Sequence, residues 1–585
     1  MEYLEEKTRI TTTMRNAILE ERQRRQALAG ADQFPLIIQG KRQGALEHLL
    51  FFKTPFAVPS SVNNLLQQIE IAYPEAAGGL QGEYLVFLVE LVLALRSLLP
   101  RWNLENSTVH GRESLSQAQV EQIAVATQSL VVRLASLTPQ VEKALLERIL
   151  VEAAARYKAE QAPNPAEAAQ ALVGSSLGEY LANYCNEISH SLLRRIAEMR
   201  FAGETATELS NDYASFLQHA LYLGVSFATT NPPLVNMAWD ILPDFWNPVI
   251  DAILRENPSA DVSHLAKLVT LEVVYEQMHL LRPIFLLSEG RMGCVCFQVD
   301  PSLHADSRAM IADALFFYDQ LCTRLGGVPN VVFKLPGTYA GLQACRALTS
   351  QGIGVTITVD FGMFQHLPFA QAMLEGQAIY CCLVEMNGRL AFPVRDELLG
   401  KLEQLSAYHI DEKAAREAAA WAGVLVARRL YQLLSQKNVD QSRIKILIAS
   451  LRIYSGEMYR CLPDAFPDIT GIVGAAILSV FPNVRYAYDH SSSIPLNPYQ
   501  IEAPVPEPIL ETLSHSEIFK QAYYVADRGW MPAENEHMHP DHELTLADEE
   551  NVFTWPPIYN TLTEFINSYN TLMNRLSERK RNIIR

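Results

Sequence analysis

The pattern of apolar and polar positions changes twice along the chain. Up to about residue 185, apolar residues recur at helical spacing in long stretches rich in Ala, Glu, Gln, Leu and Arg. From about residue 190 to 490, short β-branched runs alternate with amphipathic helical stretches. The remaining residues return to loops and helices, the latter at Glu507–Ala526 and Tyr559–Lys580. We therefore predict an N-terminal helical domain (1–185), an α/β domain (186–490) and C-terminal helices packing on it (491–585).

Eight runs in the middle region are candidate strands. Most are nearly continuously apolar, as expected for parallel strands that helices cover on both faces. Eight strand–helix units in this span favour a (β/α)8 TIM barrel, with an open doubly wound sheet as the alternative. The candidates are Ile196–Phe201, which carries two charges, Val225–Thr229, Gly293–Val299, Asn330–Leu335, Gly354–Val359, Ala378–Val384, Ile444–Ser450 and Asp468–Val473.

Composition and charge narrow the function classes. The chain is 49% hydrophobic and 19% charged, which is ordinary for a globular protein, and its formal net charge is −17. An acidic surface argues against a nucleic-acid partner. The most apolar stretch, Tyr84–Leu99, is short for a membrane span and is interrupted by Glu90 and Arg96, so we expect a buried helix and no membrane partner.

The N-terminal residues and the cysteines predict a cytoplasmic protein, and we expect no metal site. The N-terminus lacks a basic region followed by an apolar run, which predicts no signal peptide. The eight cysteines show no CxxC or framework spacing and are expected to be reduced. His537–His542 contains three histidines in a loop-like segment, to which we assign no metal, and no cofactor is expected.

Lys334 is the residue most indicative of chemistry. It interrupts the β-branched run Asn330–Leu335, where a charged lysine costs free energy unless it is paired or neutral. Burial lowers a lysine pKa, and a neutral amine is the nucleophile that attacks a ketone or aldehyde. An edge-strand lysine or a buried ion pair is the alternative interpretation. Catalytic groups of a TIM barrel lie at the C-terminal ends of its strands, where this lysine is expected.

Other predicted strands end in neutral hydrogen-bonding groups. Such groups suit carbinolamine chemistry, and a hydroxyl with a guanidinium after strand seven suits a substrate phosphate. The candidates are Thr230 and Asn231, Gln298, Thr356 and Thr358, and finally Ser450 with Arg452.

Three segments together resemble the transaldolase family. Thr229–Val235 is similar to that family's TTNPSL segment, and Ile448–Arg452 to its GASFR segment. Val332–Leu342 followed by Leu348–Thr358 resembles the family's lysine strand, the helix after it and the next strand. The resemblance covers about residues 200 to 480 in register.

The resemblance implies that Lys334 forms a Schiff base with a ketose and that retro-aldol cleavage leaves a three-carbon enamine, commonly from dihydroxyacetone. The enamine then adds to an acceptor aldose phosphate or is released by water. Asn231 and Thr358 match positions that bind the sugar or order water, and Ser450 and Arg452 match the phosphate-binding pair. Arg389 matches a second phosphate arginine in a segment that departs from the family pattern.

Two departures bear on catalysis. The family has an aspartate at the end of its first strand, as in LYLDTA; Glu204 is the nearest carboxylate in register, and Asp212 is the poorer candidate because we expect it on the following helix. A glutamate can make the same proton transfer. Gln298 stands where transaldolases carry a glutamate, which resembles the fructose-6-phosphate aldolase branch. The sixth strand end also lacks the usual serine.

Three hypotheses follow: a transaldolase acting on sugar phosphates, a Schiff-base aldolase for a different ketose, and a catalytically inactive barrel that serves as an assembly scaffold. For residues 1–185, a homo-oligomerisation module, a partner-binding domain and a lid over the barrel all stay open.

Overall fold

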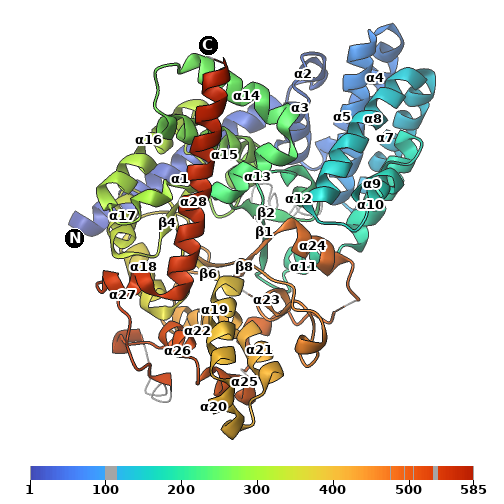
Figure 1. Ribbon diagram of the computed structural model, residues 1–585. Helices are drawn as coiled ribbons and strands as arrows, with labels where there is room; N and C mark the ends of the chain where they lie inside the picture. The colour runs from blue at the N-terminus through green and yellow to red at the C-terminus, as the bar shows by residue number, and fades with distance from the viewer. Residues whose placement is uncertain are drawn as a thin grey trace.

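A closed barrel of eight parallel strands, hydrogen-bonded in chain order, forms the centre of the molecule (Figure 1). The computed structural model describes residues 2–98, 115–474, 476–492, 494–504, 506–530 and 538–583. The predicted (β/α)8 TIM barrel is confirmed. The strands are β1 (Glu208–Asn211), β2 (Val225–Ala228), β3 (Val295–Gln298), β4 (Val331–Pro336), β5 (Val355–Thr358), β6 (Cys381–Met386), β7 (Ile444–Ala449) and β8 (Ala476–Val480).

Two of the predicted strands are wrong. Ile196–Phe201 belongs to helix α11 (Leu192–Phe201), whose buried residues recur at helical spacing behind an N-cap serine. Asp468–Val473 begins with helix α23 (Pro467–Thr470), where Pro467 occupies the first turn that proline favours. The true first strand escaped detection because it is polar: Glu208 forms a buried ion pair with Lys445 of β7 inside the N-terminal end of the barrel.

Helices cover the outside of the barrel. They begin at well-formed caps; for example, Asn231 accepts a hydrogen bond from Leu234 N–H, and Pro232 follows it at the first helical position of α13. The helices are α12 (Leu217–Tyr222), α13 (Pro232–Ile241), α14 (Pro243–Glu256), α15 (Val262–Leu287), α16 (Ser307–Leu325), α17 (Tyr339–Ser350), α18 (Met363–Glu375), α19 (Asn387–Gly400), α20 (Leu402–Leu405), α21 (Glu412–Ala420), α22 (Ala422–Gln436), α23 and α24 (Pro482–Asp489).

The N-terminal helices stand beside the barrel (Figure 1). Within this group, α5 is long and apolar enough to cross a membrane, yet most of its side chains are buried against α7, α8 and α10, as predicted for a buried helix. The domain limits at residues 185 and 490 stay predictions. The helices are α2 (Phe34–Ile38), α3 (Arg42–Glu47), α4 (Ala57–Ala72), α5 (Gly78–Ser97), α7 (Gln117–Leu137), α8 (Pro139–Ala159), α9 (Pro165–Val173), α10 (Leu177–His190) and α11.

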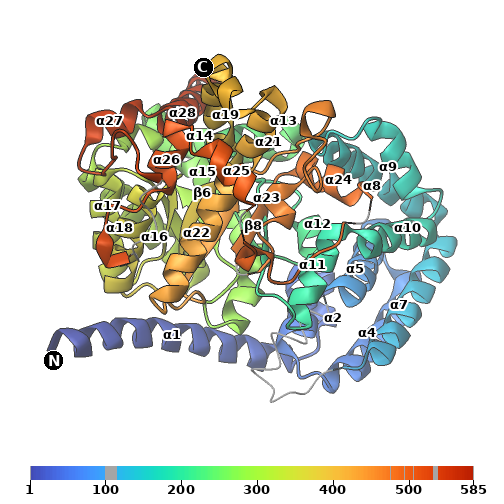
Figure 2. The same cartoon turned by 90° about the horizontal axis from the view of Figure 1, so that it is seen from below.

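The two terminal helices lie at opposite ends of the barrel (Figure 2). Helix α1 (Glu2–Ala29) crosses loops that precede strands and is anchored by the buried ion pair between Glu21 and Arg282. Helix α28 (Pro556–Ile583) packs on α13, α15 and α19, the helices that follow β2 and β6. It therefore borders the C-terminal ends of the strands, where the chemistry of this fold takes place.

The C-terminal region differs from its prediction in one place. The single helix expected at Glu507–Ala526 is two helices, α25 (Glu507–Leu513) and α26 (Glu517–Tyr523), because Ser516 caps a new helix at Phe519 N–H. Helix α27 (Glu549–Thr554) leads into α28. His537 lies outside the described residues, and the other histidines of its segment, His539 and His542, pair with carboxylates.

Candidate active site

Lys334 lies inside the barrel on β4, between Gln298 of β3 and Thr356 of β5 in strand register. Its side chain is only 4% exposed, and Nζ donates a long hydrogen bond of 3.5 Å to the Thr230 carbonyl. Burial lowers the pKa of the amine below its usual value, and the nearby Cys296 and Asp212 oppose this effect. The site therefore increases the fraction of neutral, nucleophilic amine.

Asp212 comes directly after β1 and acts electrostatically on the same amine. Thr229 donates a hydrogen bond of 2.6 Å from its hydroxyl to Asp212 Oδ1. Desolvation raises the pKa of this carboxyl, while the Lys334 ammonium and the Thr229 hydroxyl lower it. A carboxyl held beside a nucleophilic amine is suited to exchange protons with the reacting molecule.

Our expectation that Glu204 follows the first strand is wrong. Glu204 precedes β1, is exposed, and lies beside Tyr431 and Tyr499 at the opposite end of the strand from Asp212. The error comes from assigning α11 as the first strand, which placed Asp212 on the following helix. The sequence did contain the signal, because Asp212-Tyr-Ala214 corresponds to the Asp-Thr-Ala end of the LYLDTA motif.

The predicted neutral groups surround the same lysine. The Thr230 hydroxyl donates a hydrogen bond of 2.5 Å to the Cys296 carbonyl, and the Thr230 carbonyl accepts the hydrogen bond from Lys334 Nζ. Gln298 Oε1 is buried without a partner among the described residues, so it is available to a ligand. Thr358 is buried, and its hydroxyl lies 3.8 Å from the Met386 sulfur. The side-chain oxygen of Asn231 accepts the N-cap hydrogen bond of α13 from Leu234 N–H.

Ser450 and Arg452 form the next part of the site, directly after β7. Ser450 has a left-handed backbone with φ +61°, which turns the chain sharply at the strand end. Its carbonyl accepts a hydrogen bond of 3.1 Å from Gly388 N–H. A Cβ on Gly388 would lie 2.3 Å from Arg452 Cγ, so only glycine permits this close approach of the loops after β6 and β7.

Arg389 follows Gly388 in the first turn of α19 and adds a second guanidinium to this corner. Burial and the Arg389 charge both lower the pKa of Arg452, and the two guanidiniums both act to lower the pKa of Asp212. Glu564 of α28 binds Arg389 through two hydrogen bonds of 2.7 Å each. Such a fork-to-fork pair resembles the way arginine binds a phosphate. Sequence reasoning missed Glu564, which lies in a helix without a recognised motif.

A buried ionic cluster lies between α18 and the chain segments of β5 and β6. His366 of α18 stands between Asp360 and Glu385, with ring nitrogens 2.9 and 3.0 Å from the two carboxylates. Despite burial, the two carboxylates raise the pKa of His366 to about 10, so the imidazole is charged. This cluster joins the chain after β5 to β6 and was not foreseen from the sequence.

Comparison with known proteins shows which family this region resembles. The family model described as transaldolase/fructose-6-phosphate aldolase matches residues 211–455. The match runs from the last residue of β1 to the loop after β7 and includes Lys334, Asp212 and Arg452. Residues 211–455 of the barrel are thus similar to the transaldolase family, which confirms the predicted resemblance.

Individual transaldolases are similar to part of the chain. Transaldolase 1 of Streptomyces avermitilis is 31% identical over 167 residues, which cover 28% of this chain and 41% of that protein. The transaldolase of Mycolicibacterium smegmatis is 31% identical over 148 residues, 25% of this chain and 38% of that protein. The transaldolase of Thiobacillus denitrificans is 30% identical over 153 residues, 26% and 40% of the two chains. The chain thus spans about two fifths of the length of these curated relatives.

Proposed function

We propose that the barrel is a Schiff-base enzyme that transfers a three-carbon dihydroxyacetone unit between sugar phosphates. The observation that carries this proposal is the buried Lys334 amine beside the Asp212 carboxyl at the C-terminal ends of the strands. A buried amine without a full ion-pair partner is costly for stability. Its presence in a barrel that resembles transaldolases argues against the inactive-scaffold hypothesis.

In the proposed reaction, the Lys334 amine adds to the ketose carbonyl, and loss of one water from the carbinolamine gives the imine. Asp212 then accepts the proton of the C4 hydroxyl while the C3–C4 bond breaks. The electron pair of that bond forms an enamine on Lys334, and an aldehyde leaves. The enamine attacks an acceptor aldehyde, whose oxygen takes the proton back from Asp212, and water releases the product from the lysine.

The glutamine at position 298 leaves proton transfer to Asp212 alone in this proposal. An amide does not exchange a proton at neutral pH, so Gln298 binds a sugar hydroxyl or a water and leaves proton transfer to Asp212. Asn231, Thr358, Thr230 and Thr356 line the sugar path in this proposal. An aldolase of the same family acting on a different ketose uses the same steps, with release of the enamine by water.

The other end of the substrate meets Ser450, Arg452 and Arg389. Two guanidiniums and a hydroxyl beyond strands six and seven suit a phosphate. Because Glu564 already holds Arg389, an incoming phosphate either shares that guanidinium or displaces the carboxylate. This contact favours the second function, an aldolase for less charged ketoses, more than any other feature of the site.

Borohydride trapping tests the proposal. The full-length protein is incubated with fructose 6-phosphate, sedoheptulose 7-phosphate or dihydroxyacetone, reduced, digested and examined by peptide mass spectrometry. We expect a three-carbon adduct on Lys334 and none on Lys445, the other buried lysine of the barrel strands, which serves as the internal control. Absence of an adduct on Lys334 with every sugar would refute the Schiff-base function.

A further inference from the structure

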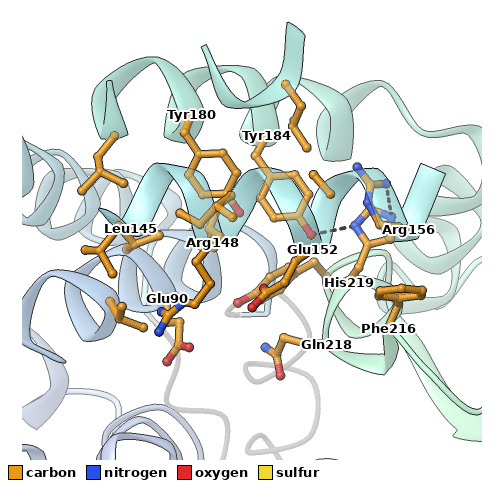
Figure 3. A pocket seen from close by; sticks show the side chains of 18 residues that line it. Glu90, Leu145, Arg148, Glu152, Arg156, Tyr180, Tyr184, Phe216, Gln218 and His219 are labelled. Carbon is orange, nitrogen blue, oxygen red and sulfur yellow. Dashed lines mark hydrogen bonds between the residues drawn. The ribbon is translucent and has the colours of Figure 1, made fainter. Parts of the chain in front are cut away.

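A cavity lies away from Lys334, where the N-terminal helices meet the barrel (Figure 3). Helices α5, α8 and α10 form three of its sides, and α12, the first helix after β1, forms another. Its volume is about 200 Å³. An engineered cavity of about 150 Å³ holds a benzene molecule, so this one accommodates a ring-sized apolar group with a few additional atoms.

The inner walls are apolar and aromatic. Tyr180 and Tyr184 stack with ring centroids 5.5 Å apart, and Tyr184 meets Tyr222 edge-on at 6.1 Å. Leu145 and Leu177 complete this surface. The Tyr180 hydroxyl has no hydrogen bond within the described part of the chain. These walls favour a branched aliphatic or aromatic group rather than a sugar.

The charged groups at the inner end are already neutralised. Arg156 binds Glu187 at 2.6 Å and Glu160 at 3.2 Å. The Tyr184 hydroxyl lies 2.7 Å from Nδ1 of His219, and burial holds the pKa of His219 well below its usual value, so this imidazole is neutral. This network therefore offers a ligand no free charge.

Unpaired charges of both signs line another part of the cavity. Arg148 and Glu152 lie one turn apart on α8, are exposed, and form no ion pair within the described residues. Glu90 accepts a bond of 3.3 Å from Arg42 through Oε1, but its Oε2 is buried without a partner among the described residues. Figure 3 shows Glu90 and Arg148 side by side at one edge of the cavity.

These features together fit a zwitterion with an apolar side group. A carboxylate would pair with Arg148, an ammonium group with Glu152 or Glu90, and a ring-sized side chain would fill the space lined by tyrosines. A simple amine would leave Arg148 unmatched, and a simple acid would leave Glu152 unmatched. We propose that this cavity is a regulatory site for a free α-amino acid with an aliphatic or aromatic side chain.

The site is connected to Asp212 through a short loop. Phe216 lines the cavity and has a left-handed backbone with φ +56°, which is strained for a phenylalanine. Its ring stacks on Tyr213 at 6.2 Å, and Asn211 Nδ2 holds the Tyr213 carbonyl at 2.8 Å. Asp212 lies between Asn211 and Tyr213 in the sequence. A ligand that fixes Phe216 therefore changes the conformational freedom of Asp212, the proposed proton-transfer group.

Calorimetry on the full-length protein tests the site without reference to catalysis. The probes are L-phenylalanine and L-leucine, with 2-phenylethylamine and 3-phenylpropionate as analogues that lack one charge. We expect the amino acids to bind about fivefold more tightly than either analogue, and Arg148→Gln to weaken their binding by about fivefold. Glu147→Gln, on the same helix outside the cavity, is the matched control and should leave binding unchanged.

Two results would overturn the proposal: no binding heat from either amino acid at millimolar concentration, or equal binding by the Arg148→Gln variant. Only the regulatory part rests on the proposed function. Lys334→Ala abolishes turnover but should bind the amino acid normally, which separates failure of the site from failure of the catalytic proposal. Amino-acid binding to the wild-type protein that leaves kcat and KM unchanged would overturn the link to Asp212 while supporting the site.

Discussion

The contact between Glu564 and Arg389 leads to a sharp prediction about substrate charge. The Nη1 and Nη2 atoms of Arg389 each lie 2.7 Å from a carboxylate oxygen of Glu564. The guanidinium carbon also lies over the Phe565 ring, 5.4 Å from its centroid. The hydrogen bonds from Arg389 keep the pKa of Glu564 below its usual value, so the carboxylate is ionised at neutral pH. It therefore competes with an anionic substrate group for the same guanidinium.

Glu564→Gln removes the competing charge and keeps the shape of the side chain. Arg389 is 19% exposed and Glu564 is 50% exposed, so solvent screens the pair. Exposed pairs of this kind contribute at most about 1 kcal/mol. Since about 1.4 kcal/mol corresponds to a tenfold change, we expect KM for a phosphorylated ketose to fall by up to about fivefold, with kcat nearly unchanged. High salt should reduce the difference.

Steady-state kinetics with phosphorylated and unphosphorylated donors would measure this effect. KM for dihydroxyacetone should not change, because that donor has no phosphate. Asp240→Asn is a matched control. It removes the charge from the 2.7 Å ion pair between Asp240 of α13 and Arg575 of α28, the helix that also carries Glu564. A rise in KM for the phosphorylated ketose in Glu564→Gln would refute the reasoning, because it would mean that Glu564 orients Arg389 for the substrate instead of competing for it.

Three further predictions concern the barrel. Asp212→Asn should lower kcat by about 10²–10⁴-fold, whereas Glu204→Gln should leave it unchanged; equal effects in steady-state assays would contradict the assignment. Burial lowers the pKa of Lys334 and Asp212 opposes that shift, so kcat/KM should rise with pH as the amine loses its proton. Asp212→Asn should move this acid limb to lower pH, and a move to higher pH would count against the electrostatic argument. Lys445→Met leaves the buried Glu208 unpaired and should reduce the free energy of unfolding by about 3–5 kcal/mol in urea titrations, with partial recovery in the double variant that adds Glu208→Gln.

The interior strands and the buried lysine could be predicted from the sequence because their signals are local. The apolar runs around β4 and β5 are continuous, and a lysine such as Lys334 contrasts with its β-branched neighbours. The motifs that begin at Thr229 and end at Arg452 also keep their order along the chain, which is enough to indicate the fold and the family.

Other features depend on pairing between distant segments. The polarity of β1 is acceptable only because Lys445, far away in the sequence, neutralises Glu208 within the closed barrel. Once that strand is misplaced, so is Asp212, since its proposed role follows from its position at a strand end rather than from its residue type. The sequence by itself therefore determined the barrel and its lysine. Only the tertiary structure decided which carboxylate faces that lysine, that Glu564 reaches Arg389, and that helices α5, α8 and α10 enclose a cavity against α12, because long-range packing brings these groups together.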